Sequence, residues 1–234
     1  MKTKLNKIKS KVLNVPPTKV KYCIFPSKFC DYNQFDLSRI HPHAGVNRGV
    51  FDENPDGYVK FNSKDWDKKP GVIFTKLLEF IALKNHYTGK QNWKNSKFAK
   101  RNVNYIKCNN SVRGLTNYKE YLKTREKQID DLFNSIIKNG VHDYYEYKKK
   151  NIRLMSGAHK DNISVVLTRN NELFFNNRGH HRLSIAKILN LREIPINIVV
   201  AKSKKEIEKF YSINKNYKNE PRTLGNIEYS DIKN

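Results

Sequence analysis

Cysteine is scarce in this sequence of 234 residues, and its scarcity excludes a disulfide-stabilised scaffold. Only three cysteines occur, and the spacing of Cys23 and Cys30 fits no zinc-binding pattern. Long apolar runs are also lacking, since stretches such as residues 198–201 are far shorter than the roughly 20 residues of a membrane span. The lysine-rich start of the chain leads into no hydrophobic segment, so we expect no secretory signal. These absences predict a cytoplasmic protein in a reducing setting, with no membrane partner.

Acidic residues are few as well. The chain carries 46 Lys and Arg against 22 Asp and Glu, which gives a formal net charge of +24. Such an excess favours a polyanion, DNA or RNA, as a partner. Lysine is the main source of the charge and is spread along the whole chain, and Lys, Asn and Ile are all encoded by A/T-rich codons. Genome composition is therefore the alternative explanation for the basic character.

The first half of the chain predicts little regular structure. With 38% hydrophobic and 12% aromatic residues, the composition is typical of a globular protein. Proline and glycine interrupt the N-terminal part, where residues 20–25 form the only clear strand. Apolar residues at helical spacing predict a helix over about 70–86, and Trp66 and Trp93 are interpreted as packing anchors. We expect a helical and irregular N-terminal region over residues 1–116.

A long amphipathic helix is expected after this region. Asn117 and Glu120 have the spacing of a capping pair at its start. Apolar residues between Tyr118 and Ile137 then recur on one helical face, and Gly140 supplies the C-terminal stop. An extended piece over 143–147 is expected to follow.

Strands alternate with shorter helices in the rest of the chain. Three segments have the composition of strands: residues 163–167, 173–175 and 195–200. Asn170 and Asn171 predict a two-residue hairpin turn between the first two. The next segment, 183–189, is apolar on most sides and predicts a buried helix. Ser203 and Glu206 form a capping box for a last helix that ends at about residue 214.

The junction between the second strand and the buried helix carries the strongest chemical signal. Its sequence is Arg178-Gly179-His180-His181-Arg182. The first amides of a helix have no acceptor within the helix and carry a partial positive charge, so an anion is stabilised there. Gly179 allows a ligand to approach the backbone, and the Arg182 guanidinium suits phosphate oxygens. Either histidine could add a donor that titrates near neutrality.

Residues 129–200 resemble the ParB/sulfiredoxin-like fold. Residues 129–140 resemble the helix before the first strand of ParB proteins, and residues 191–200 resemble the closing strand. Between them, residues 175–186 resemble the family's nucleotide-binding turn, which is usually Asp-Gly-x-His-Arg followed by Leu and Ala. The resemblance implies an α+β fold, with a small mixed sheet and packed helices in residues 117–216.

The rest of the chain fits the same resemblance. Residues 65–67 and Trp93, with their spacing to the turn, resemble a widespread group of functionally uncharacterised microbial proteins that end in this domain. The N-terminal region is then expected to pack on residues 117–216, and residues 217–234 to form a tail. Relatives bind and hydrolyse CTP while loading onto DNA, repair sulfinic acids with ATP, phosphorylate small molecules, or act as nucleases. Their shared feature implies that residues 179–182 line the phosphates of a nucleotide.

Two departures from the family pattern limit what the resemblance implies. Sulfiredoxins place a reactive cysteine where this chain has His180, so sulfinic acid reduction by that chemistry is not expected. Arg178 replaces the acidic residue that commonly precedes the glycine. A cation there adds affinity for anions but removes a carboxylate for acid–base or metal chemistry. Whether the protein is an enzyme therefore stays open.

The sequence predicts no transition metal. His41 with His43, and His180 with His181, are the only close histidine pairs, and neighbouring helical positions point about 100° apart. We therefore expect that His180 and His181 do not share an ion. Mg²⁺ brought in with a nucleoside triphosphate needs one or two carboxylates, and Asp143 and Glu146 are the candidates. The alternative for both is a solvated carboxylate at a strand edge.

The leading hypothesis is a nucleotide- or phosphate-binding protein, an NTP-using phosphotransferase or nucleotide hydrolase if it is an enzyme. Its partner would be a nucleotide or a phosphorylated small molecule. One alternative is a sequence-indifferent DNA- or RNA-binding protein with nuclease activity, in which the nucleic acid backbone is contacted by two basic clusters, Lys148–Lys150 and Lys202 with Lys204 and Lys205. A second alternative is a catalytically degenerate domain kept for protein contacts.

Overall fold

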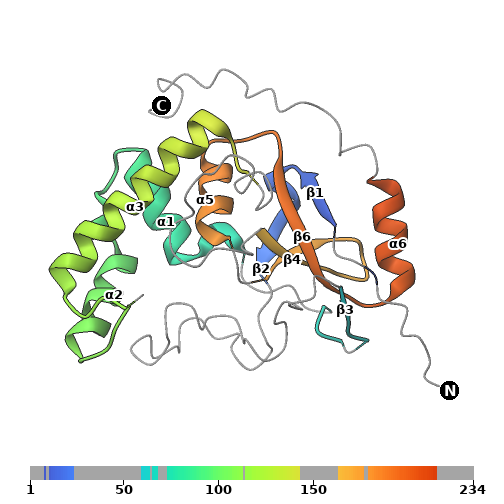
Figure 1. The fold of residues 1–234 in the computed structure, drawn as a ribbon, viewed down its shortest axis with the longest axis horizontal. Helices are drawn as coiled ribbons and strands as arrows, with labels where there is room; N and C mark the ends of the chain where they lie inside the picture. Colours follow the sequence, from blue (N-terminus) through green and yellow to red (C-terminus); the bar gives the residue numbers. More distant parts are fainter. Residues whose placement is uncertain are drawn as a thin grey trace.

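The computed structural model describes residues 8, 11–23, 59–63, 65–67, 73–112, 114–142, 163–176 and 179–214. Within these residues the chain folds into a mixed β-sheet with helices on two sides of it (Figure 1). The helices are α1 (Leu78–Tyr87), α2 (Lys97–Lys107), α3 (Tyr118–Asn139), α5 (His180–Ile188) and α6 (Lys204–Ile213). This arrangement confirms the α+β fold class. Helix α5 lies between the sheet and the group of helices α1, α2 and α3, and α6 lies beyond the opposite side of the sheet.

Within the described residues the sheet has six strands, and it contains both parallel and antiparallel pairs. In order across it lie β1 (Val12–Val15), β6 (Ile194–Ala201), β4 (Ile163–Leu167), β5 (Leu173–Phe175) and β2 (Val20–Cys23). A short strand, β3 (Lys60–Phe61), pairs with the end of β6. The pairs of β6 with β4 and of β5 with β2 are parallel, whereas β1 with β6 and β4 with β5 are antiparallel.

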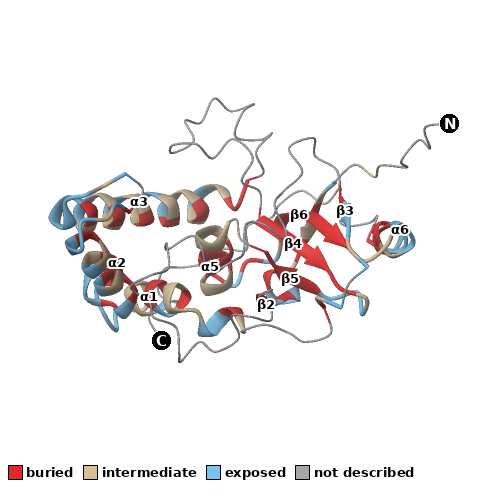
Figure 2. Cartoon of the chain, turned by 90° about the horizontal axis from the view of Figure 1, so that it is seen from below, coloured by how far each residue is buried: buried red, intermediate tan, exposed pale blue. Residues whose placement is uncertain are grey.

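The three strands expected after residue 160 are confirmed. Strands β4 and β5 have the predicted bounds, and β6 extends one residue beyond the predicted strand at each end. All residues of β4 and β5 are buried, because helices or other segments cover both faces of the sheet (Figure 2). Such burial explains their nearly continuous apolar sequence.

The N-terminal region contributes more to the sheet than expected. Strand β2 confirms the described part of the strand predicted over 20–25, but it is not the only strand there. Strand β1 pairs with β6 from Val12 opposite Asn197 to Val15 opposite Ile194. Four residues carry too short a pattern to indicate a strand, and the pairing with β6 stabilises this one. Strands from both halves of the chain thus share one sheet.

The hairpin between β4 and β5 also differs from the prediction. Its loop has three residues, Arg169 to Asn171, because the Thr168 amide donates to the Glu172 carbonyl at 2.9 Å. Asn171 adopts the left-handed conformation with φ of 61°, and its amide donates back to the Thr168 carbonyl at 3.1 Å. This is the geometry of a turn followed by a bulge, and it brings Arg169 to the tip of the hairpin.

Local signals set the bounds of most helices. The Asn117 side chain accepts hydrogen bonds from the amides of Lys119 and Glu120, and α3 ends at Gly140, whose φ is 70°. The capping box of α6 is present as predicted. The helix expected over 70–86 begins later, at Leu78, because a 3-10 turn at residues 74–76 and an extended Leu77 precede it. No helix within the described ranges combines the length and apolar character needed to cross a membrane.

The buried residues form three groups, of which two involve the helices. The larger one joins the sheet to α5, whose Leu183, Ile185 and Ala186 are fully buried, and this confirms the predicted buried helix. The smaller one surrounds Trp93 between α1, α2 and α3. Trp93 is completely buried, so its interpretation as a packing anchor is confirmed. Trp66 is half-buried against a third group, and its indole nitrogen donates to the Asn62 carbonyl at 2.9 Å.

An ion pair attaches the segment around Trp66 to the hairpin tip. Both carboxylate oxygens of Asp67 accept from Arg169, at 2.7 Å from the backbone amide and at 2.7 Å from Nη2. Asp65 accepts from the same guanidinium at 2.7 Å. Burial raises the pKa of Asp67, but the hydrogen bonds from Arg169 and the charge of Lys202 outweigh it and hold that pKa below its usual value.

We expect Asp67→Asn to destabilise the protein at neutral pH and to make its stability less sensitive to acid. Because the pKa of Asp67 is lower in the folded state, its carboxylate stabilises the fold above about pH 4. This contribution is lost as the pH falls through the lowered pKa. Urea denaturation from about pH 7 to about pH 2.5 spans the titration of this carboxylate. The difference in free energy of unfolding between wild type and variant should therefore shrink in acid.

Asp131→Asn is the matched control, because Asp131 pairs with Lys127 at 2.8 Å on an exposed surface. Exposed pairs contribute little, so this variant should stay close to wild type throughout. If the difference in free energy of unfolding between wild type and Asp67→Asn stays constant with pH, the ionised Asp67 carboxylate does not have the stabilising role described.

Candidate functional site

The predicted glycine–histidine turn lies where β5 leads into α5. Gly179 precedes the first helical residue and has the left-handed φ of 81°, which favours glycine. A Cβ at this position would lie 2.9 Å from the backbone and side chain of Ile163 in β4. The close approach that requires glycine is therefore to Ile163, which seats the start of α5 directly on the sheet.

The predicted site residues fall into two groups. Gly179, His180, His181 and Arg182 are brought together at the first turn of α5, and Arg182 is half-buried there. Three other residues lie outside the described part of the chain: Arg178, Asp143 and Glu146. The extended piece expected over 143–147 and the lysines at 148–150 also fall there.

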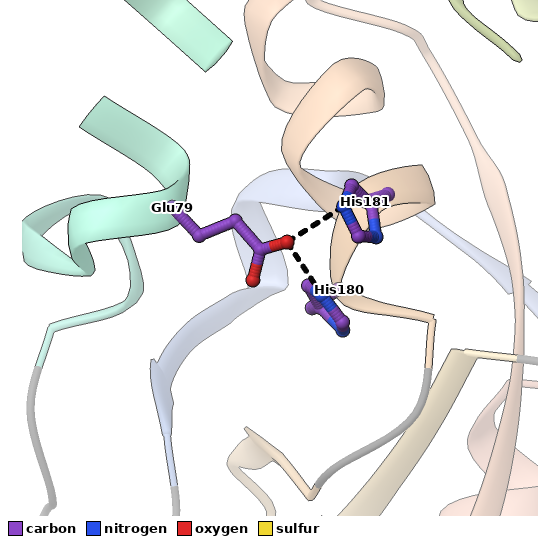
Figure 3. A group of neighbouring side chains, drawn as sticks. All are labelled: Glu79, His180 and His181. Carbon is purple, nitrogen blue, oxygen red and sulfur yellow. Dashed lines mark hydrogen bonds and ion pairs between the residues drawn. The ribbon is translucent and has the colours of Figure 1, made fainter. Parts of the chain in front are cut away.

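A glutamate that sequence reasoning missed lies at the centre of the turn. Glu79, the second residue of α1, points its carboxylate at both histidines (Figure 3). Its Oε1 atom lies 2.7 Å from Nε2 of His180 and 2.6 Å from Nε2 of His181. All three side chains are at least four-fifths buried, with exposed fractions of 14% for Glu79, 19% for His180 and 12% for His181. We call these three residues the Glu–His cluster.

The two histidines converge, so the expectation that they point apart is wrong. Their ring centroids are 4.2 Å apart, with an angle of 40° between the ring planes. Neighbouring helical positions do diverge at Cβ, but an imidazole is long enough for its Nε2 to turn back toward a shared partner. Glu79 supplies that partner from another helix, which the spacing within α5 alone cannot reveal.

Arg125 of α3 closes the other side of the cluster. Its Nη2 lies 2.9 Å from Nε2 of His181, and its Nη1 donates to Oε1 of Gln128 at 2.6 Å. Only 7% of Arg125 is exposed, because it lies on the face of α3 that carries Tyr121 and Ile129. Helices α1, α3 and α5 thus each contribute a charged or titratable side chain to one point.

Burial and the neighbouring charges determine the protonation of the cluster. Burial raises the pKa of Glu79, but the attraction and hydrogen bonds of His180 and His181 outweigh it, so that pKa lies well below its usual value. Burial lowers the pKa of His181 to about 3; the Glu79 carboxylate opposes this shift, and His180 and Arg125 add to it. At neutral pH, Glu79 is therefore an ionised carboxylate and His181 a neutral imidazole.

The arrangement offers two kinds of chemistry. The first turn of α5 and the Arg182 guanidinium favour an anion. The Glu–His cluster offers a base and three atoms able to bind a metal, all within 4.8 Å of one another. An ionised carboxylate repels an anion, so the two functions are compatible only when a proton or a cation lies between them.

One weak signal in the sequence could have indicated Arg125, but none indicated Glu79. Arg125 occupies a position on the apolar stripe of α3, four residues after Tyr121 and four before Ile129. A charged residue in such a stripe usually has a buried partner. Glu79 lies on α1, 101 residues before His180, and only the packing of α1 against α5 brings the two together.

Comparison of the chain with protein family models, with curated proteins and with solved structures gave no match. The resemblance to the ParB/sulfiredoxin-like fold therefore stays a prediction, and the site is interpreted from its own geometry.

We expect Glu79→Gln to lower the free energy of unfolding by about 1.5–3 kcal/mol, the usual contribution of hydrogen bonds to a buried charged group. The variant keeps the shape of the side chain and removes the charge that both histidines face. Urea denaturation in the presence of EDTA measures the difference without a contribution from metal ions.

Asp130→Asn is the control, because Asp130 also pairs with a histidine, His86, at 3.0 Å. Asp130 is 42% exposed, so its removal should cost no more than about 1 kcal/mol. Equal effects of the two variants would show that the Glu–His cluster is no more stabilising than a surface pair.

Proposed function

We propose that the protein binds a nucleotide or another phosphate-bearing ligand at the first turn of α5, which we call the phosphate seat (residues 179–182). The observation that carries the proposal is the left-handed Gly179 immediately before a helix that has Arg182 in its first turn. The amides of the first helical turn have no acceptor within the helix, and the helix dipole adds a partial positive charge. Phosphate oxygens suit both features and the planar guanidinium.

The rigidity of the phosphate seat supports this proposal. Helix α5 is held on the sheet by Leu183 and Ile185, which are fully buried, and Gly179 rests against Ile163. A seat held by buried contacts does not have to become ordered when a ligand binds, and this lowers the cost of binding. Arg125, beside His181, adds a second guanidinium near the same turn.

Glu79 determines how a phosphate would bind here. Its carboxylate lies within 2.7 Å of both histidines and is ionised, so a phosphate is expected to arrive together with a cation. Mg²⁺ carried by a nucleoside triphosphate meets this need. A cytoplasmic location remains part of the proposal, because cysteine is scarce.

Thermal unfolding with ATP, ADP, CTP or inorganic pyrophosphate, each with Mg²⁺, tests the proposal. A ligand at about a hundred times its Kd should raise the Tm of the wild type by roughly 5–10 °C. Arg182→Ala should lose most of this shift. Arg192→Ala removes the same charge beyond the opposite end of α5 and should keep the shift. No shift with any of these ligands in the wild type would contradict the proposal.

A second candidate function, binding of a nucleic acid backbone, is favoured by the charge around α2. No Asp or Glu occurs between Glu79 and Glu120. The lysines of this stretch that the structure describes are exposed, and we call five of them the α2 lysine surface: Lys90, Lys94, Lys97, Lys100 and Lys107. None of the five forms an ion pair with a described carboxylate. Uncompensated lysines on one helix and its preceding loop suit a row of phosphates.

The basic cluster at residues 202–205 is less available for contact with a nucleic acid. Lys202 is mostly buried and donates to the Ser63 carbonyl at 2.6 Å, with the carboxylates of Asp65 and Asp67 less than 4 Å away. Lys204 lies 3.6 Å from Glu208 on α6. Compared with Lys202 and Lys204, the residues of the α2 lysine surface are therefore the better candidates for contact with DNA or RNA.

Replacing Lys94, Lys97 and Lys100 together by glutamine should weaken binding to double-stranded DNA and flatten its dependence on salt. Each lost phosphate contact should change the slope of log K against log [salt] by about 0.9. The matched control replaces Lys204, Lys205 and Lys209, which are exposed on α6 on the far side of the sheet (Figure 1). Equal losses in both variants would indicate that net charge alone, and not this surface, attracts DNA.

A further inference from the structure

In the Glu–His cluster, one ring nitrogen of His181 contacts two partners that it cannot both satisfy by hydrogen bonds. Nε2 of His181 lies 2.6 Å from Oε1 of Glu79 and 2.9 Å from Nη2 of Arg125. A ring nitrogen with a proton donates and cannot accept, whereas one without a proton accepts and cannot donate. Arg125 has only donors and the Glu79 carboxylate only accepts, so this one nitrogen satisfies one partner and not the other in every protonation state. The His181 side chain is nearly nine-tenths buried, and an unsatisfied contact is costly there.

We propose that Glu79, His180 and His181 form a binding site for a divalent transition metal, with Zn²⁺ as the best match. The two imidazole Nε2 atoms and the carboxylate Oε1 atom are its ligands. A cation at this point accepts lone pairs from all three atoms at once, and His181 no longer has to divide one nitrogen between two partners. The site goes beyond phosphate binding, because the metal binds without any nucleotide.

The type of ligand selects the metal. Two imidazoles and one carboxylate are a common set for Zn²⁺ and for other first-row metals, whereas Mg²⁺ prefers oxygen ligands. Three protein ligands leave a fourth position open for water or a phosphate oxygen. The positive charge of the metal also balances Glu79, which otherwise repels an anion from the neighbouring phosphate seat.

Only small movements separate the described geometry from a metal complex. With bonds of about 2.0–2.1 Å, the ligand atoms of a tetrahedral site lie roughly 3.3 Å apart. The present separations from Oε1 of Glu79 are 2.6 and 2.7 Å, and all three ligand atoms lie within 4.8 Å of one another, so shifts of each side chain by about 1 Å or less reach this spacing. Arg125 gives up its contact with His181 and keeps its hydrogen bond to Gln128.

Co²⁺ serves as the probe, because its absorption reports both binding and coordination by nitrogen and oxygen. Titrating the full-length, EDTA-treated protein should give one Co²⁺ per chain, displaced by one equivalent of Zn²⁺ and unaffected by excess Mg²⁺. Glu79→Gln and His180→Asn should each weaken Co²⁺ binding by about tenfold or more. Asp130→Asn, which breaks the separate pair with His86, should bind as wild type does.

Arg125→Gln provides a variant in which the three ligands are intact. Arg125 competes with the metal for Nε2 of His181. Its removal should therefore tighten Co²⁺ binding by at least about threefold. A purely structural role of Arg125 does not predict this gain. Unchanged or weaker binding would contradict this competition.

The proposal is overturned if the wild type binds no stoichiometric Co²⁺. It is equally overturned if the Co²⁺ spectrum persists in Glu79→Gln, since another group of histidines then holds the ion. Circular dichroism of the EDTA-treated variants confirms that they are folded, and His180→Asn gives an independent reading if Glu79→Gln is not. The Co²⁺ titration contains no nucleotide, so its result is independent of the outcome of the thermal unfolding test with nucleotides.

Discussion

A single carboxylate organises the site. Glu79 extends from the start of α1 to the first two residues of α5, and Arg125 of α3 completes the contact from the opposite side. Three helices that meet at one buried, charged point cannot shift independently, because any displacement leaves a charge or a polar nitrogen without its partner. The position of α5, and with it the phosphate seat, depends on this contact as well as on the packing of Leu183 and Ile185 against the sheet.

The site combines groups with opposite preferences. The first turn of α5 and its arginine favour negative charge, whereas Glu79 favours positive charge. Neighbouring groups of this kind suit a site where a cation and an anion bind together. The proposed metal is the cation, and the proposed phosphate ligand is the anion. The α2 lysine surface, in contrast, lies in the helical part away from the sheet, and none of its lysines pairs with a described carboxylate (Figure 1). A small ligand at the first place and a polyanion at the second are separate proposals.

Much of the local structure could be predicted, because short-range interactions decide it. The Asn117 cap and the Gly140 stop delimit α3, and the capping box of Ser203 opens α6. Strand β4 and its partners were recognisable because strands buried on both faces are apolar throughout. Strand β1 was not, since its four residues are a strand only because β6 offers an edge to pair with. The hairpin loop was predicted too short, because the bulge at Asn171 depends on the register of β4 and β5.

The same division applies to the candidate site. By itself the sequence determined the turn from β5 into α5 and the positions of the two histidines and Arg182 in the first turn, because a glycine before an amphipathic or buried helix is a local signal. Only the tertiary structure decided that the histidines converge and that Glu79 and Arg125 meet them. Those partners belong to α1 and α3, and the spacing of residues along one helix contains no information on which side chain another helix places opposite it.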